Sequence, residues 1–183
     1  MTPLTSASPL RSATTFAACA LAFLALAAVS LASMAGAQAP SPFAGTWKLN
    51  PAQSKLQTIS PPGSAVASIT FDGTHWHYQR KHEYAARKPE IFSFDLQLNA
   101  PQPSVEKDGP FTFASRLTRE GEALVLHQDI TAANGEKASS VIRYTLANHA
   151  QTLIETERKL TPSHEETNRW VFDRVLSRGN TRP

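Results

Sequence analysis

Cysteine is almost absent from this sequence. The one cysteine among the 183 residues, Cys19, lies in an apolar run near the N-terminus. We reject lipoprotein processing at Cys19, because it comes near the start of that run and Phe16 is unsuitable at its upstream position. The rest of the chain contains no thiol, so oxidising surroundings pose no hazard to it.

An excess of charge of either sign is missing too. Residues 1–37 carry a single charged side chain, Arg11, and residues 38–183 hold 17 basic residues against 15 acidic ones. This surplus is too small to favour nucleic acid or an anionic membrane as a partner.

Residues 1–37 have the pattern of a secretory signal peptide. An apolar run over residues 16–31 follows Arg11, and Ala35-Gly36-Ala37 forms a small-x-small cleavage motif. A membrane-anchor helix is the alternative, since the run is nearly long enough to span a bilayer, but its alanine-rich composition and the motif favour a leader. We therefore predict a secreted or periplasmic protein with no membrane span after processing. Its mature part, residues 38–183, has the length of one domain.

Helical periodicity is also absent. No window after residue 57 places apolar side chains at helical spacing over a useful length, and polar and apolar residues alternate instead. The first such stretch, residues 43–50, puts four side chains on one face of an expected strand: Phe43, Gly45, Trp47 and Leu49.

More strands are expected at short intervals along the chain. The clearest cover residues 65–71, 74–84, 90–98, 111–119, 122–131 and 169–178, and two more surround the turn at residues 148–150. Asp72-Gly73 and Glu120-Gly121 mark tight hairpin turns. Residues 99–110 contain three prolines and are expected to form a loop.

Two later loops decide which side chains face inward. A three-residue loop with Gly135 at positive φ places Tyr144 on the inner face. The same loop length at residues 148–150 sets Tyr144 opposite Ile154 and turns Arg158 inward.

The pattern predicts an all-β fold, an antiparallel up-and-down β-barrel of about 8–10 strands. A two-sheet sandwich shares the alternation, but successive hairpins leave no long Greek-key connection. Closure of the barrel also removes exposed strand edges.

The first strand carries a family signature. Gly45-Thr46-Trp47 resembles the Gly-x-Trp motif of the lipocalins and the wider calycin group. In that group the tryptophan packs at the closed end of the barrel, beneath an arginine of the last strand. The resemblance therefore implies that Trp47 and Arg174 close this barrel.

Two longer stretches are similar to a family of uncharacterised secreted bacterial domains. Residues 43–55, FAGTWKLNPAQSK, resemble the opening of that family, and residues 169–174, RWVFDR, resemble its ending. These matches lie at the two ends of the expected domain, and they imply a lipocalin-like fold rather than an activity.

The inner face is expected to carry a group of side chains suited to a ligand: Arg80, Arg158, Tyr78, Tyr144, Trp76 and Gln128. A buried guanidinium needs a partner, because an unpaired internal charge costs several kcal/mol. Either Arg80 reaches the rim and water, or Arg80 and Arg158 hold the carboxylate of a ligand through paired hydrogen bonds. The second arrangement resembles fatty-acid-binding barrels, which use arginine and tyrosine together.

Enzyme motifs are missing from the sequence. It has no Gly-x-Ser-x-Gly elbow, no nucleophilic cysteine and no phosphate-cradling glycine loop, so we predict neither a reaction nor a cofactor. His75 and His77 share one strand face at a spacing that zinc and copper sites use. We favour a solvated polar face there, because the expected neighbours Thr70 and Ser68 are poor metal ligands.

Three functional hypotheses follow, in order of preference. The first is a secreted or periplasmic barrel that binds a small apolar or amphipathic molecule, lipid-like or fatty-acid-like, with or without an acidic group. The second is a filled barrel of the cell envelope with a structural or protein-interaction role. The third is a metal-dependent enzyme that uses His75 and His77. The oligomeric state is left open.

The signal peptide is tested by the N-terminus of the exported protein. Because Ala35-Gly36-Ala37 fits the cleavage motif, the mature chain is expected to begin Gln38-Ala39-Pro40. Edman sequencing or intact mass spectrometry measures this directly. A membrane-bound form that retains Met1 would contradict the prediction.

Overall fold

The computed structural model describes residues 41–58 and 60–176. The expected signal peptide and its cleavage site lie outside the described residues. Within the described part, no helix is long and apolar enough to cross a bilayer.

Within the described residues, ten strands form one antiparallel sheet. They are β1 (Gly45–Leu49), β2 (Ser64–Phe71), β3 (His75–Glu83), β4 (Glu90–Gln97), β5 (Ser104–Asp108), β6 (Phe111–Glu120), β7 (Ala123–Ala132), β8 (Lys137–Ala147), β9 (Thr152–Leu160) and β10 (Glu165–Arg174). The expectation of a loop over residues 99–110 was wrong, because this segment contains β5. Pro103 and Pro110 flank β5 and so remove no hydrogen bond from within it.

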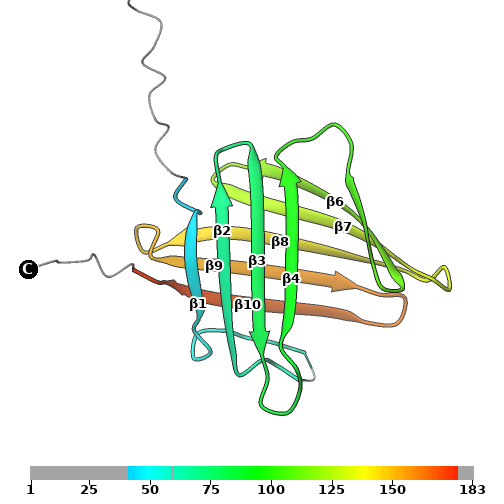
Figure 1. Cartoon of the computed structure of the whole chain (residues 1–183), viewed down its shortest axis with the longest axis horizontal. Coiled ribbons are helices and arrows are strands. Elements are labelled where there is room, and N and C mark those ends of the chain that lie inside the picture. The colour runs from blue at the N-terminus through cyan, green and yellow to red at the C-terminus, as the bar shows by residue number, and fades with distance from the viewer. Residues whose placement is uncertain (1–40, 59, 177–183) are drawn as a thin grey trace, which may run out of the picture. The chain divides into compact units, whose positions relative to one another are not determined.

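The sheet closes almost completely on itself. β1 pairs with both β2 and β10, so the first and last strands are neighbours, and the sheet ends at the edge strands β4 and β5. Figure 1 shows β1–β4 as one layer, with β6–β10 crossing behind it. At one end of the opening between β4 and β5, Leu98 bridges to Leu117 of β6. The prediction of an all-β, antiparallel up-and-down barrel is therefore confirmed.

Strict alternation of side chains builds the interior. Every second residue of β2 and β3 is buried, as the sequence pattern predicted. The largest apolar side chains of the core come from both layers: Phe43, Trp47, Phe71, Trp76, Tyr78, Tyr144, Trp170 and Phe172. Removing this apolar surface from water is the main force that holds the two layers together.

Trp47 and Arg174 meet at one end of the barrel, as the lipocalin resemblance implied. Trp47 is fully buried, and the guanidinium of Arg174 lies 4.0 Å from the centroid of its ring. Arg174 also donates hydrogen bonds to the carbonyl oxygens of Ala44 and Ala150, each at 2.8 Å. A cation over an indole face, with its N–H groups paired, closes this end without leaving an unsatisfied charge.

The first strand requires a glycine at position 45. Its φ is +140°, and a Cβ added there would lie 2.6 Å from Nη1 of Arg174. Any side chain at position 45 would displace the guanidinium that covers Trp47. The Gly-x-Trp pattern thus reflects a steric requirement of the closed end.

The loop between β7 and β8 has the predicted length. Ala132 N–H donates to the Glu136 carbonyl at 2.9 Å, and Gly135 has a φ of +84°. Three residues therefore separate the paired positions, and Tyr144 faces the interior opposite Leu124. This register prediction is confirmed.

The register predicted between β8 and β9 was wrong by one residue. Asn148, His149 and Ala150 all adopt left-handed backbone conformations, with φ between 52° and 61°. Gln151 N–H closes this turn on the Asn148 carbonyl at 3.1 Å, so four residues rather than three separate the strands. Because strand side chains alternate, the extra residue exchanges the two faces of β9.

The β2–β3 hairpin is longer than predicted, and the two-residue β6–β7 turn lies one residue later, at Gly121-Glu122. Neither difference exchanges the faces of the strands. Asp72 Oδ1 accepts hydrogen bonds from the N–H groups of Thr74 and His75, at 2.8 and 2.7 Å, which widens the first turn to four residues. Ile69 consequently lies opposite Tyr78 instead of Trp76. A shift of two residues preserves which side chains point inward.

Replacing Trp47 tests the closed end of the barrel. Trp47→Ala removes a fully buried side chain and the ring that Arg174 packs against. The free energy of unfolding, measured in urea, is therefore expected to fall by about 3–5 kcal/mol relative to the wild type. Trp47→Phe keeps an aromatic face and is expected to lose clearly less. A loss below about 1 kcal/mol for Trp47→Ala would contradict the proposed packing.

Candidate functional site

One half of the barrel interior is filled by aromatic side chains. Trp76 packs edge-on against Phe43 and Phe71, with ring centroids 5.9 and 5.5 Å apart. It also contacts Tyr144 at 5.4 Å. Trp47 and Trp76 are both fully buried, so this half of the interior is packed with side chains.

The other half contains a cavity of about 270 Å³. It is bounded by β3 and β4 on one side and by β5–β9 on the other, next to the opening between the two edge strands. Its lining comprises Tyr78, Arg80, Ile91, Phe92, Ser93, Phe94, Glu106, Asp108, Phe113, Ser115, Gln128, Ile130, Ser140, Ile142, Tyr144, Glu157 and Lys159. Aromatic and polar side chains thus line one cavity.

A buried ion pair forms the floor of this cavity. Arg80 Nη1 donates to Glu155 Oε2 at 2.6 Å, and Tyr78 Oη donates to Glu155 Oε1 at 2.8 Å. The Glu155 side chain is fully buried. Both of its oxygens are therefore occupied by strong donors, as a buried carboxylate requires.

The two charges of this pair feel opposing effects. Burial raises the pKa of Glu155, while Arg80 and the Tyr78 hydroxyl favour the ionised carboxylate. Burial also opposes the charge on Arg80, but its acidic neighbours raise the pKa of the guanidinium above its usual value. Burial raises the pKa of Tyr78 as well, so the phenol keeps its proton and acts as a donor.

Aromatic rings enclose the guanidinium of Arg80. Its central carbon lies 4.5 Å from the ring centroid of Trp170 and 5.7 Å from that of Phe92. Arg80 Nε is buried and has no hydrogen-bond partner. The side chain is thus held by Glu155 and by two rings, while its buried Nε–H is left without a partner.

His82 extends this cluster toward the β3–β4 turn. Its ring stacks on Trp170 with centroids 5.2 Å apart, and its Nδ1 lies 3.1 Å from the hydroxyl of Tyr84. Burial, helped by Arg80 and Arg87, lowers the pKa of His82 to about 3. His82 is therefore neutral at ordinary pH and adds no positive charge to the interior.

Polar side chains line the opposite wall of the cavity. Gln128 Nε2 donates to Ser115 Oγ at 3.0 Å, and the buried Ser140 Oγ has no hydrogen-bond partner. Glu157 accepts hydrogen bonds from Asn168 Nδ2 at 3.2 Å and from Trp170 Nε1 at 3.4 Å. This wall offers a ligand both donors and acceptors.

Five of the six side chains predicted to bind a ligand lie on the inner face. Tyr78, Arg80, Gln128 and Tyr144 line the cavity. Trp76 is fully buried in the filled half, where it supports Tyr78 and Tyr144. Their part in binding remains a prediction.

The inward orientation expected of Arg158 was wrong. Its side chain is 61% exposed on the outer face and pairs through Nε with Glu165 Oε1 at 2.6 Å. The four-residue loop at 148–151 is the cause, because it turns Glu155 inward and Arg158 outward. The same slip concealed Glu155, the internal partner that Arg80 had seemed to lack.

The acidic side chains of β5 were also missed. Glu106 and Asp108 line the cavity from a segment assigned to a loop. Ser104, Glu106 and Asp108 occupy alternate positions, which was the available signal for one face of a strand.

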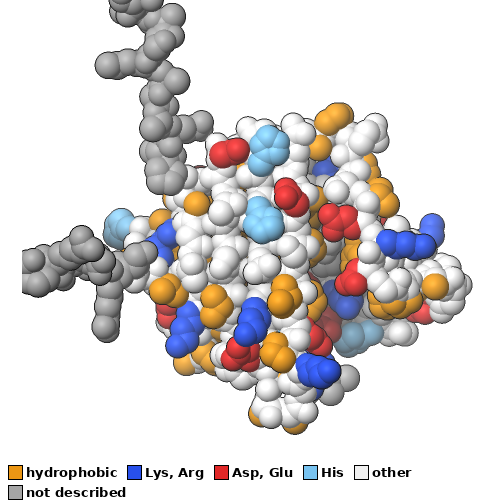
Figure 2. All heavy atoms as spheres, viewed as in Figure 1, with side chains coloured by type: hydrophobic (Ala, Val, Ile, Leu, Met, Phe, Trp, Pro, Cys, Tyr) orange, Lys and Arg blue, Asp and Glu red, His pale blue; other side chains and the backbone are white. Residues whose placement is uncertain are grey.

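His75 and His77 lie on the outer face of β3, where Figure 2 shows histidine side chains exposed at the surface. His75 Nδ1 is 3.4 Å from Asp72 Oδ2, and His77 Nδ1 is 3.7 Å from Asp95 Oδ2. Among residues 41–58 and 60–176, no group of three or more His, Cys, Asp or Glu side chains is placed to hold a metal ion.

No protein-family model matches the chain, and no curated protein sequence matches it. Solved structures do match its fold. A secretory abundant heat soluble protein from Ramazzottius varieornatus is 12% identical with a TM-score of 0.52, over 75% of this chain and 98% of that one. A zebrafish ileal bile acid-binding protein complexed with cholic acid is 15% identical with a TM-score of 0.47, over 74% of this chain and 100% of that one.

These similarities concern the fold alone. The ten antiparallel strands, the pairing of the first strand with the last and the nearly closed sheet define a β-barrel of the lipocalin and fatty-acid-binding-protein type. A shared fold does not imply a shared function, so the cavity is the feature that bears on function.

Substitution of Glu155 tests the ion pair. Glu155→Gln leaves the buried Arg80 without a counter-charge and is expected to lower the free energy of unfolding by about 3–5 kcal/mol. Tyr78→Phe removes only one hydrogen bond to Glu155 and is expected to cost about 1–3 kcal/mol. Denaturant titration measures both.

Removing both charges separates the pair from its surroundings. The double variant Arg80→Met/Glu155→Gln is expected to be more stable than Glu155→Gln alone, since no unpaired charge remains inside. Equal or lower stability of the double variant would contradict the expectation that Glu155→Gln leaves an unfavourable unpaired charge inside the barrel.

Proposed function

We propose that this barrel binds a small, largely apolar or amphipathic molecule in the cavity between β3–β4 and β5–β9. The observation that carries the proposal is the cavity of about 270 Å³, lined by aromatic rings on one side and hydrogen-bonding groups on the other. Small-molecule sites typically start at roughly 300 Å³ and combine an apolar lining with a few placed polar groups. The cavity therefore suits a compact ligand.

The aromatic wall supplies most of the expected affinity. Phe94 stacks on Tyr78 with centroids 5.9 Å apart, and Tyr144 lies 5.7 Å from Tyr78. Phe92 is 38% exposed and lies at the edge of the same wall. An apolar ligand that covers these rings gains roughly 25 cal/mol for each Å² removed from water.

Two unpaired polar atoms support the proposal independently. Ser140 Oγ and Arg80 Nε belong to residues that line the cavity, and each is buried without a partner. A buried polar group left unpaired costs about 1–3 kcal/mol. A ligand with matching groups would recover this free energy and take a fixed orientation.

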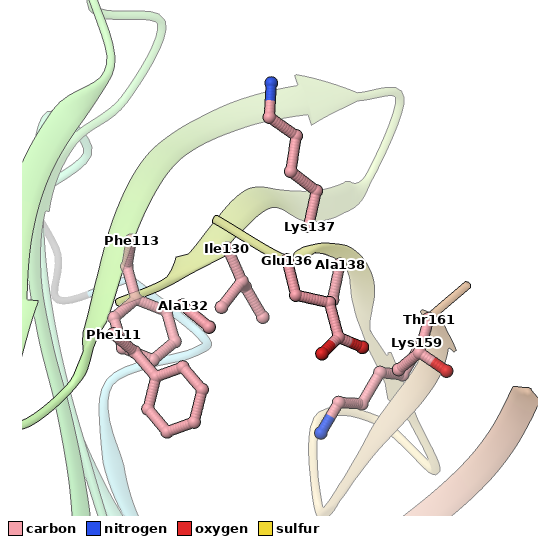
Figure 3. A pocket seen from close by; sticks show the side chains of 9 residues that line it. All are labelled: Phe111, Phe113, Ile130, Ala132, Glu136, Lys137, Ala138, Lys159 and Thr161. Carbon is pink, nitrogen blue, oxygen red and sulfur yellow. The ribbon is translucent and has the colours of Figure 1, made fainter. Parts of the chain in front are cut away.

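A second pocket extends the space available. It measures about 250 Å³ and shares Phe113, Ile130 and Lys159 with the cavity. Figure 3 shows Phe111 and Phe113 side by side on one of its sides, with Lys159 and Thr161 of the β9 end on the other. A ligand longer than the cavity is expected to extend into this pocket.

The cellular location is inferred from the sequence and not from the barrel. We infer that residues 1–37 are a signal peptide and that the mature domain, residues 38–183, works in the periplasm or outside the cell. The apolar run and the Ala35-Gly36-Ala37 motif support this inference, as does the similarity of residues 43–55 to a family of secreted bacterial domains.

A protein-interaction barrel is the second candidate. It is favoured by the unpaired edges of β4 and β5, which expose Ile91 and Val105 to 61% and 64%. Such edges are able to accept a further strand. The cavity ranks ligand binding first, because a barrel used only for its surface has no need of internal space.

Filling the cavity tests the proposal. Ser140→Phe places a ring in the cavity and is expected to reduce binding of the neutral apolar dye Nile red at least about tenfold, since the added side chain occupies the ligand's space. Ser139→Phe is the matched control, because Ser139 directly precedes Ser140 in β8 and lies on the opposite, outward face of the strand. Fluorescence titration measures binding, and thermal melting checks that both variants fold.

Two results would contradict ligand binding. One is the absence of saturable Nile red binding to the wild type. The other is equal binding by the folded Ser140→Phe and Ser139→Phe variants.

A further inference from the structure

We infer that the cavity selects a ligand with a positive charge, such as a protonated amine on a compact aromatic or aliphatic body. The inference rests on the proposed function and goes beyond it, because it assigns the ligand's charge. An acidic group on the ligand was expected because two arginines were predicted to face inward without a partner. The structure removes that assumption, since Arg158 faces outward and Arg80 is paired with Glu155.

The lining of the cavity contains more acidic than basic groups. Its cationic residues are Arg80 and Lys159, and its acidic residues are Glu106, Asp108 and Glu157. Arg80 is already neutralised by Glu155, which lies directly behind it at 2.6 Å. Three carboxylates then face one exposed ammonium group, so the space available to a ligand is negatively charged.

The carboxylates of β5 have no cation of their own. Within the described part of the chain, neither Glu106 nor Asp108 forms an ion pair or a side-chain hydrogen bond. They lie opposite Phe113 and Phe111 of β6, so each carboxylate stands beside an aromatic ring. A ligand cation placed there would meet a negative charge and an aromatic ring together.

Glu157 lies on the other side of the cavity, on β9. Its hydrogen-bond donors, Asn168 Nδ2 and Trp170 Nε1, are both neutral. Hydrogen bonds from neutral donors stabilise a carboxylate without cancelling its field. Glu157 and the β5 carboxylates therefore attract a cation from two sides.

The remaining lining also suits a cation. The faces of Phe92, Phe94 and Phe113 carry the negative part of the ring quadrupole, which attracts an ammonium group. Ser140 is only 3% exposed, and its unpaired Oγ can accept a hydrogen bond from an N–H donor. The same carboxylates would repel a carboxylate ligand, and this discriminates against acids.

The test uses three probes that share one ring system and differ in charge. At neutral pH and low salt, 2-naphthylmethylamine, 2-naphthylmethanol and 2-naphthoic acid compete with Nile red for the full-length mature protein. The ammonium is expected to displace the dye at a concentration at least about tenfold lower than the carboxylate, with the alcohol between them. Added salt is expected to reduce this preference, because the β5 carboxylates are exposed.

Two double variants identify the source of the preference. Glu106→Gln/Asp108→Asn removes the β5 charges and is expected to reduce the ratio between ammonium and carboxylate at least about threefold. Glu122→Gln/Asp129→Asn is the control, because it changes the net charge equally at exposed positions that do not line the cavity. The control is expected to keep the wild-type ratio.

The outcomes separate the charge inference from the proposed function. Binding of the alcohol with equal or tighter binding of the carboxylate overturns the charge inference and leaves ligand binding intact. A ratio unchanged in Glu106→Gln/Asp108→Asn, or reduced equally in the control, overturns the role of β5. Failure of Nile red and of all three probes to bind overturns both.

Discussion

The interior of this barrel depends on the ion pair between Arg80 of β3 and Glu155 of β9. These strands belong to different layers (Figure 1), so the 2.6 Å contact joins the two layers across the core. A buried pair is tolerated only with close geometry and further hydrogen bonds, and Tyr78 supplies one. A slip of β9 by one residue would leave Arg80 unpaired. The pair and the strand register therefore stabilise each other.

The same pair divides the barrel into a filled half and an open half. On one side of it, Trp76 and the aromatic rings around it pack tightly, and Arg174 covers Trp47 at the end of the barrel. On the other side, small and polar residues such as Ser115 and Ser140 replace large apolar ones and leave a cavity. The filled half supplies the stability that an open half cannot, since lost packing is costly.

The charge of the cavity results from how the charged residues are distributed between the two faces of the strands. Because Arg80 is paired internally, it contributes little field to the space beside it. Arg158 pairs with Glu165 outside the barrel and contributes none. The carboxylates of Glu106 and Asp108 remain in the cavity lining, and they are the basis of the proposed preference for a positively charged ligand.

The sequence alone determined the fold class, the inner face of most strands and the closed end. Alternation has a period of two, so a hairpin longer or shorter by two residues, as at Asp72, left every inward side chain correctly assigned. Only the tertiary structure decided the floor and the charge of the cavity. Three consecutive residues in the left-handed conformation, beginning at Asn148, lengthened the β8–β9 loop by one residue, and the local sequence pattern did not predict them. That single residue exchanged Arg158 for Glu155, because a register shift of one moves every side chain of a strand to its other face.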